Sequence, residues 1–248
     1  MRKSANIGVA GLLFLLAANQ IPAVESAPEG VILLHGLART TRCMEPMAEA
    51  LRAAGFIVVN QGYPSRSTSI SNLTAYLDRA LDDPALATCP RIHLVTHSMG
   101  GILVRLRLTQ GIPPRLGRHV MLGPPNQGSE VVDKIGDWAP FRWINGPAGQ
   151  ELGTGPTGPA SLGPARLETG IIAGRWTING GNSLMIPGPD DGKVSVERTK
   201  LDGMKDHVVL RSSHPFLMKN REAIALTIRF LQTGSFSENH SSESKEQE

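Results

Sequence analysis

The chain has 248 residues, of which 40% are hydrophobic and 19% charged, a composition that fits one large or two small soluble domains. Its formal net charge is only +3, and its lysines and arginines are scattered along the sequence. No basic stripe with interleaved aromatic residues is present, so we expect no nucleic-acid partner.

The first 26 residues have a composition of their own. Arg2 and Lys3 precede an uncharged run with an apolar centre at Ile7–Ala18, and residues 24–26 place small side chains around a possible cleavage point. This order is typical of a signal peptide. The apolar centre is shorter than the ~20 residues that a membrane-spanning helix needs. We therefore expect a signal peptide at 1–26 and a secreted or periplasmic mature protein without a stable membrane span. An uncleaved N-terminal anchor is the alternative.

From residue 27 on, apolar runs alternate with amphipathic segments. The predicted strands are Val31–His35, Phe56–Asn60, Ile92–Thr96, His119–Leu122, Ile171–Gly174 and Val208–Leu210. The predicted helices are Met44–Ala54, a segment with Leu73, Leu77 and Leu81 that Ser69 or Ser71 can cap, Gly100–Leu108 and Phe216–Leu231. Continuous apolar strands separated by helices indicate a parallel sheet covered on both faces. We therefore predict one α/β domain over residues 27–233, with a mostly parallel sheet of about six strands.

Two segments lie outside this alternation. Residues 126–169 are rich in glycine and proline and carry Trp138, Phe141 and Trp143. A long segment without clear periodicity is usually functional or disordered. It is predicted either to cap a substrate pocket that these aromatic side chains line, or to be a surface loop that they anchor. The second segment, 234–248, is rich in serine, glutamate and lysine and is predicted to be a disordered polar tail.

The chain contains two cysteines, too few for a disulfide scaffold. Cys43 follows the first predicted strand, whereas Cys89 precedes a later one, so they belong at opposite edges of a parallel sheet. A disulfide requires Cα atoms within ~7 Å of each other. We therefore expect two free thiols.

A candidate nucleophile stands in the sequence RIHLVTHSMGG. An apolar strand ends there, a helix follows, and Ser98 lies at the sharp turn between them. Such a turn exposes the serine hydroxyl and aims the first helical amides at whatever bonds to it. Gly100 and Gly101 allow the helix to start close to a neighbouring strand. The G-x-S-x-G pattern is incomplete because Thr96 replaces its first glycine. The placement predicts a nucleophile, with a purely structural turn as the alternative.

A serine nucleophile needs a base, and the base needs an orienting acid. His214 follows the last predicted strand, whereas His207 opens that strand and so belongs at the opposite edge of the sheet. Asp190 and Asp191 lie in a turn-rich loop after the preceding strand. Asp191 is favoured because Gly192 permits a tight turn that presents its carboxylate inward. Asp190 is then expected to be a solvated turn residue.

The sequence also contains candidate donors for an oxyanion hole and a histidine pair that could be taken for a metal site. The backbone amide of Met99 directly follows the candidate nucleophile, and the amide of Leu37 follows the first strand, so both are candidate oxyanion donors. His35-Gly36 can also be read as a plain strand-ending turn. His93 and His97 are four residues apart, but on a strand they span ~13 Å and cannot share a metal ion. We expect no metal site.

Four short motifs together resemble the α/β-hydrolase family: LHG at 34–36, THSMGG at 96–101, DDGKV at 190–194 and SHPFLM at 213–218. The pattern is most similar to compact bacterial serine lipases and esterases that lack the family's first two strands, some of which carry alanine or threonine at the position of Thr96. The resemblance extends from Val31 to Leu231. It implies an α/β-hydrolase-like three-layer sandwich and ester hydrolysis through an acyl-serine, without a metal or organic cofactor.

The predicted function is therefore hydrolysis of a small-molecule or lipid carboxylic ester by Ser98, His214 and Asp191. Acyl transfer or thioester cleavage by the same residues is one alternative. A catalytically silent binding protein on this scaffold is another, because one fold hosts many functions. Acyl length, leaving group and oligomeric state are left open by the sequence.

Overall fold

The computed structural model describes residues 27–177 and 180–238. The predicted signal peptide and residues 239–248 of the predicted tail lie outside this range, so both stay predictions. None of the described helices has the length and apolar character needed to cross a membrane. Cys43 and Cys89 are both free.

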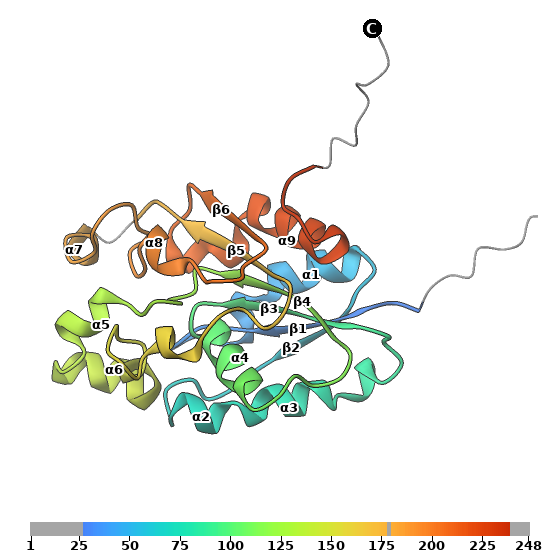
Figure 1. Ribbon diagram of the computed structural model, residues 1–248, viewed down its shortest axis with the longest axis horizontal. Helices are drawn as coiled ribbons and strands as arrows, with labels where there is room; N and C mark the ends of the chain where they lie inside the picture. The colour runs from blue at the N-terminus through green and yellow to red at the C-terminus, as the bar shows by residue number, and fades with distance from the viewer. Residues whose placement is uncertain (1–26, 178–179, 239–248) are drawn as a thin grey trace, which may run out of the picture.

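Six strands form one parallel sheet in the order β2-β1-β3-β4-β5-β6 (Figure 1). They are β1 (Gly30–Leu34), β2 (Ile57–Gln61), β3 (Ile92–His97), β4 (Leu116–Leu122), β5 (Thr169–Gly174) and β6 (Asp206–Leu210). The predicted fold class is confirmed. The chain runs outward from β1 to β2 and then crosses back to β3, so the winding direction changes between β1 and β3. In open α/β sheets, ligands bind beyond the carboxyl ends of the strands at such a switch point.

Helices cover both faces of the sheet (Figure 1). One layer holds α1 (Glu45–Ala53) and α9 (Arg221–Thr233), and the other holds α2 (Ile70–Leu73), α3 (Ala75–Leu81) and α4 (Met99–Thr109). Successive side chains of β1 point alternately toward the two helix layers. Val31 and Leu33 pack in the core with α1 and α9, whereas Ile32 and Leu34 pack in the core with α2, α3 and α4. Burial on both faces is why β1 is continuously apolar.

Two predicted helices are each divided in the structure. The segment that carries Leu73, Leu77 and Leu81 forms α2 and α3, and Ser69 caps α2 by accepting a hydrogen bond from the amide of Asn72. The predicted helix Phe216–Leu231 is a 3-10 helix at His214–Lys219 followed by α9. The break falls at Asn220, because its extended backbone and side chain form the N-cap of α9.

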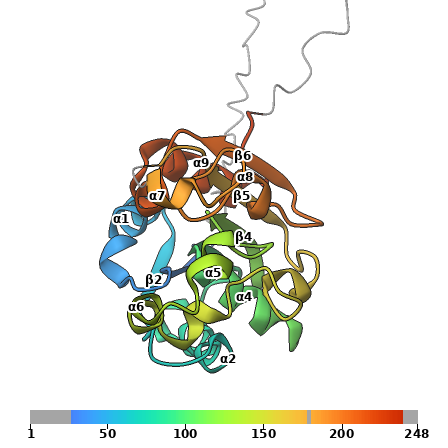
Figure 2. The same cartoon turned by 90° about the vertical axis from the view of Figure 1, so that its left-hand side faces the viewer.

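Helices make up half of the segment 126–169, which the sequence left without a predicted element (Figure 2). It contains α5 (Glu130–Ile135), α6 (Ala139–Gln150) and a 3-10 helix at Pro159–Leu162. Its periodicity is hidden in the sequence because α6 is kinked: Gly146 has a φ of 65° and Pro147 follows it. The remaining short helices are α7 (Gly180–Ser183) and α8 (Val196–Thr199), with 3-10 turns at Thr41–Cys43 and Pro84–Leu86.

The start of the predicted tail belongs to the folded domain. Gly234 ends α9 in the left-handed conformation, and Phe236 is only 4% exposed because its ring packs against Phe230. The amide of Phe236 and the hydroxyl of Ser235 donate to the carboxylate of Asp206. The predicted tail boundary at residue 234 is therefore wrong for residues 234–238, because one aromatic side chain in a polar stretch completes the core.

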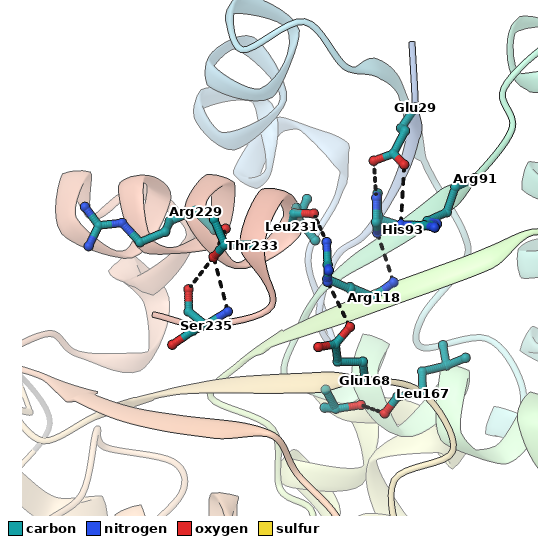
Figure 3. Close-up of polar contacts among 11 residues, drawn as sticks. Glu29, Arg91, His93, Arg118, Leu167, Glu168, Arg229, Leu231, Thr233 and Ser235 are labelled. Atoms are coloured by element: carbon teal, nitrogen blue, oxygen red, sulfur yellow. Dashed lines mark hydrogen bonds and ion pairs between the residues drawn. The ribbon is translucent and has the colours of Figure 1, made fainter. Parts of the chain in front are cut away.

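A polar network ties strands and helix together at the amino edge of the sheet (Figure 3). Arg118 donates from Nε to Glu168 over 2.9 Å and from Nη1 to the carbonyl of Leu231 over 2.7 Å. Its backbone amide donates to Nδ1 of His93, and Nε2 of His93 lies 2.8 Å from a carboxylate oxygen of Glu29. These contacts fix α9 against β3 and β4 at the edge remote from the carboxyl ends of the strands.

Burial of His119 predicts a loss of stability in acid. Its Nε2 lies 2.9 Å from the hydroxyl of Thr96, and burial, assisted by the charge of Arg105, lowers its pKa to about 3 from 6.5. Between these two pH values the unfolded chain binds a proton at this imidazole and the native protein does not. The free energy of unfolding therefore falls as the pH drops below 6.5, by about 2 kcal/mol at pH 5 for this residue.

We expect His119→Gln to be less stable than the wild type at pH 7 but to lose less stability between pH 7 and pH 5. Urea unfolding of both proteins at the two pH values measures the difference. Equal losses in the two proteins would contradict the assignment.

Candidate active site

Ser98 occupies the turn between β3 and α4 in a strained conformation. Its φ is 52°, a value that non-glycine residues rarely adopt, and its side chain is buried. Its amide donates to the carbonyl of Leu122 at the end of β4 over 2.9 Å. The hydroxyl is thereby held at the carboxyl edge of the sheet, next to the first turn of α4.

Two glycines allow α4 to begin this close to the sheet. A Cβ on Gly100 would lie 2.7 Å from the carbonyl oxygen of Leu34 and 2.8 Å from that of His35. A Cβ on Gly101 would lie 2.4 Å from the Cε of Met121. The close approach predicted from these glycines is confirmed, because larger side chains would collide with β1 and β4.

Three side chains from distant parts of the sequence form one hydrogen-bonded chain. Nε2 of His214 lies 3.0 Å from Oγ of Ser98, and Nδ1 lies 2.7 Å from Oδ2 of Asp191. A carboxylate can only accept, so Nδ1 carries the imidazole proton and Nε2 accepts from the serine hydroxyl. Such an arrangement can take the proton of the hydroxyl as its oxygen attacks an electrophile.

The loop after β5 holds Asp191 in place. Its Oδ1 accepts from the amides of Lys193 and Val194 over 3.0 and 2.9 Å, and its carbonyl accepts from the amide of His214 over 2.9 Å. The carboxylate is almost fully buried. The backbone of this loop therefore positions both the acid and the histidine.

Asp190 differs from the sequence-based expectation. It is only 6% exposed, so the prediction of a solvated turn residue is wrong. Its carboxylate accepts from the amide of Gly192 over 2.7 Å and from the hydroxyl of Ser183. Asp190 thus closes the turn that presents Asp191, and its burial follows from the packing of α7, which the sequence did not predict.

His97 has a positioning contact that sequence reasoning missed. Its Nε2 donates to the carbonyl of His214 over 3.0 Å, and the two rings lie 4.7 Å apart. Burial, followed by the charge of His214, lowers the pKa of His97 well below its usual value, so the ring is neutral. The only sequence signal was its position next to Ser98, because the contact joins residues 117 positions apart.

Two backbone amides border the turn at Ser98. Met99 is the first residue of α4, and Leu37 follows β1. Within the described residues neither amide has an acceptor. The Leu37 loop is fixed by Tyr63, whose ring stacks on His35 at 4.2 Å and whose hydroxyl donates to the His35 carbonyl. Both amides are therefore available to a negatively charged oxygen.

A cavity of about 220 Å³ opens beside Ser98 and His214. The segment 126–169 contributes most of its apolar wall, including Val132 and Phe141. Trp138 and Trp143 are instead 63% and 84% exposed. The prediction that all three aromatic side chains line a pocket, or that all three anchor a loop, therefore holds only in part: Phe141 lines the cavity and the two tryptophans face outward.

Arg105 on α4 anchors both ends of this segment. Its Nη1 donates to the carbonyl and side-chain oxygens of Asn126, and its Nη2 donates to the carbonyl of Gly163 over 2.7 Å. Burial lowers the pKa of Arg105 to about 10. The side-chain amide of Asn126 in turn donates to the carbonyl of Thr199. The stems of the segment thus belong to the core of the protein.

Three further histidines have partners outside this cluster. His93 contacts Glu29, His119 contacts Thr96 and His207 contacts Thr199. In the described part of the chain, no group of three or more histidine, cysteine, aspartate or glutamate side chains could hold a metal ion.

Residues 31–190 match a protein family described as the alpha/beta hydrolase family. The chain belongs to this family. No curated protein sequence is significantly similar to this chain.

Solved structures resemble this alpha/beta hydrolase at low sequence identity. The mature lipase BlEst2 of Bacillus licheniformis is 20% identical, with a TM-score of 0.69 over 84% of this chain and 93% of that one. The phospholipase PlaB of Legionella pneumophila is 17% identical, with a TM-score of 0.67 over 84% and 60%. A lipase-esterase related protein of Clostridium acetobutylicum is 13% identical, with a TM-score of 0.55 over 83% and 95%. At these identities the likeness establishes the shared fold.

We expect Gly100→Ala to destabilise this protein by ~1–3 kcal/mol, since its Cβ must displace backbone rather than a flexible side chain. Gly155→Ala is the matched control, because a Cβ there meets no atom within 4 Å. Thermal and urea unfolding measure both. Equal stability of the two variants would contradict the packing argument.

Proposed function

We propose that this alpha/beta hydrolase cleaves carboxylic esters through an acyl-serine intermediate on Ser98. The observation that carries the proposal is the hydrogen-bonded chain from Asp191 through His214 to Ser98, which ends at a cavity with an apolar wall. A nucleophile, a base and an orienting acid are the groups that acyl transfer to a serine requires.

In the first step, Oγ of Ser98 attacks the ester carbonyl while Nε2 of His214 takes the hydroxyl proton across the 3.0 Å contact. A bond forms between Oγ and the carbonyl carbon, and the carbonyl electron pair moves to its oxygen. The imidazole becomes a cation. Asp191, 2.7 Å from Nδ1, stabilises this cation and keeps the ring in the productive tautomer.

The negative oxygen is assigned to the amides of Leu37 and Met99, which have no other acceptor among the described residues. The amino end of α4 adds its dipole to this interaction. When the tetrahedral intermediate collapses, the alcohol leaves with the proton of His214. Water then attacks the acyl-serine by the same route, and its proton returns to Ser98 as the carboxylic acid departs.

The substrate is proposed to be an ester with an apolar group, since Val132 and Phe141 line the cavity next to Ser98. The similar folds of the lipase BlEst2 and the phospholipase PlaB agree with a lipid or small apolar ester as substrate. The preferred acyl chain length is measured by hydrolysis rates on p-nitrophenyl esters of increasing acyl length, with and without emulsified triglyceride.

Ser98→Ala is expected to lower kcat/KM on a short p-nitrophenyl ester by at least about a thousandfold, because the attacking oxygen is removed. Unfolding curves should remain cooperative. Ser71→Ala, on the exposed surface of α2, is the control. Labelling by a fluorophosphonate gives a second readout: a wild-type protein that is not labelled at Ser98 would favour a silent binding protein.

The two neighbouring aspartates are expected to have different effects. Asp191→Asn should lower kcat by at least about a hundredfold, since an amide at Oδ2 can donate to Nδ1 and favour the wrong tautomer. Asp190→Asn keeps an acceptor for the Gly192 amide and is expected to act mainly on stability. Steady-state kinetics of both variants measure the contrast. A larger loss of kcat in the Asp190 variant would overturn the assignment of Asp191.

Acyl transfer uses the same intermediate and is separated from hydrolysis by the fate of the acyl group. We expect water to be the main acceptor when methanol or a thiol is added at millimolar concentration. Product analysis that finds most of the acyl group on the added alcohol or thiol would replace hydrolysis with acyl transfer.

A further inference from the structure

The cavity beside Ser98 has an apolar and a cationic lining that come from different parts of the chain. The segment 126–169 contributes the apolar side chains Val131, Val132, Phe141, Ile144 and Leu152. The cationic lining consists of Arg39 and Lys193. Arg39 lies two residues after Leu37, and Lys193 lies two residues after Asp191, so both cations flank the reacting groups on loops that the mechanism already uses.

No carboxylate is among the described residues that line this cavity. The acid closest along the chain is Asp191, and its oxygens are occupied: Oδ2 accepts from His214 and Oδ1 accepts from two backbone amides. In the described part of the chain neither Arg39 nor Lys193 forms a side-chain ion pair or hydrogen bond. Neither cavity cation is therefore ion-paired with a carboxylate of the described residues.

Some cations elsewhere on the same fold are ion-paired. Arg107 on α4 binds the carboxylate of Asp78, and Arg198 on α8 binds that of Glu130. These arginines have partners although they lie away from the cavity. The two cavity cations differ from these arginines in having no ion-pair partner among the described residues.

Arg39 and Lys193 also lie near enough to act on each other. Desolvation by the surrounding protein lowers the pKa of Lys193, the charge of Arg39 lowers it further, and the carboxylate of Asp191 opposes the shift. Two like charges that are not ion-paired repel, and the repulsion is relieved when an anion binds between them. An anionic group on the substrate would supply that counter-ion each time it enters the cavity.

We infer that the preferred substrate is an ester of an apolar acyl group with an alcohol that bears an anion, a carboxylate or a phosphate, which Arg39 and Lys193 bind. The apolar wall binds the acyl group, so Arg39 and Lys193 are available to bind the alcohol part of the ester. This inference rests on the proposed ester hydrolysis and defines its substrate class. An arginine and a lysine suit both anions, because the guanidinium binds two oxygens at once and the ammonium binds as a point charge.

The test compares butanoate esters in which the alcohol part is one of three phenols of similar shape. These are meta-hydroxybenzoate, meta-hydroxyphenyl phosphate and the neutral meta-hydroxybenzamide. The measured quantity is the ratio of kcat/KM on each anionic ester to kcat/KM on the neutral ester. We expect ratios of about ten or more for the wild type at low salt, a size typical of charge-assisted hydrogen bonds. The ratios should fall as salt is added.

Variants assign the preference to the two cations. Arg39→Gln and Lys193→Gln should each lower the ratios severalfold, and Lys193→Glu should bring them below one because the charge is reversed. Lys205→Glu is the matched control. It makes the same charge change on an exposed residue directly before β6, at the amino edge of the sheet, and should leave the ratios unaltered.

The outcomes separate this inference from the proposed function. Retained turnover of all three esters by Ser98→Ala would overturn ester hydrolysis at this site. Turnover that depends on Ser98 but shows wild-type ratios near one, or ratios that Lys193→Glu does not change, would overturn the anion site and leave ester hydrolysis standing. A high ratio for only one anion would support the site and identify its anion as phosphate or carboxylate.

Discussion

The close contact between the start of α4 and the sheet is the constraint on which the site depends. Gly100 lies so near the carbonyls of β1 that no Cβ fits, and Ser98 takes up the sharp reversal with a φ of 52°. The helix therefore begins directly after the serine, with the positive end of its dipole at Ser98. Strain at a single residue is sustained because β1, β3 and β4 hold the backbone on both sides of the turn. The histidine and the acid approach this fixed point on loops that share backbone hydrogen bonds.

Much of this arrangement could be predicted because a parallel sheet converts chain order into position. Ser98, Asp191 and His214 each follow a strand, and the carboxyl ends of parallel strands share one edge. Small residues near each side chain marked the turns. The same logic correctly placed His207 at the remote end of β6, where it contacts Thr199 instead of the site. The alternation of continuous apolar runs with helices was enough for the fold class and the number of strands.

What the sequence did not reveal depends on contacts between distant segments. The buried carboxylate of Asp190 accepts from the hydroxyl of Ser183, seven residues away along the chain. The contact of His97 with the carbonyl of His214 joins residues 117 positions apart. The helical nature of the segment 126–169 was hidden because Gly146 interrupts α6, and the polar stretch after α9 concealed Phe236 as a core residue. Local periodicity carries no information about such contacts, since each one is made by the tertiary packing.

The buried guanidinium of Arg105 limits how the wall of the cavity can move. It binds Asn126 and Gly163, which stand near the two ends of the segment that carries Phe141. A hinge at these stems would strip a desolvated cation of its acceptors, at a cost of several hydrogen bonds. A rearrangement of the cavity wall that keeps these bonds therefore has to arise inside the segment, between its two stems. A residue that does not line the cavity thus constrains the position of its wall.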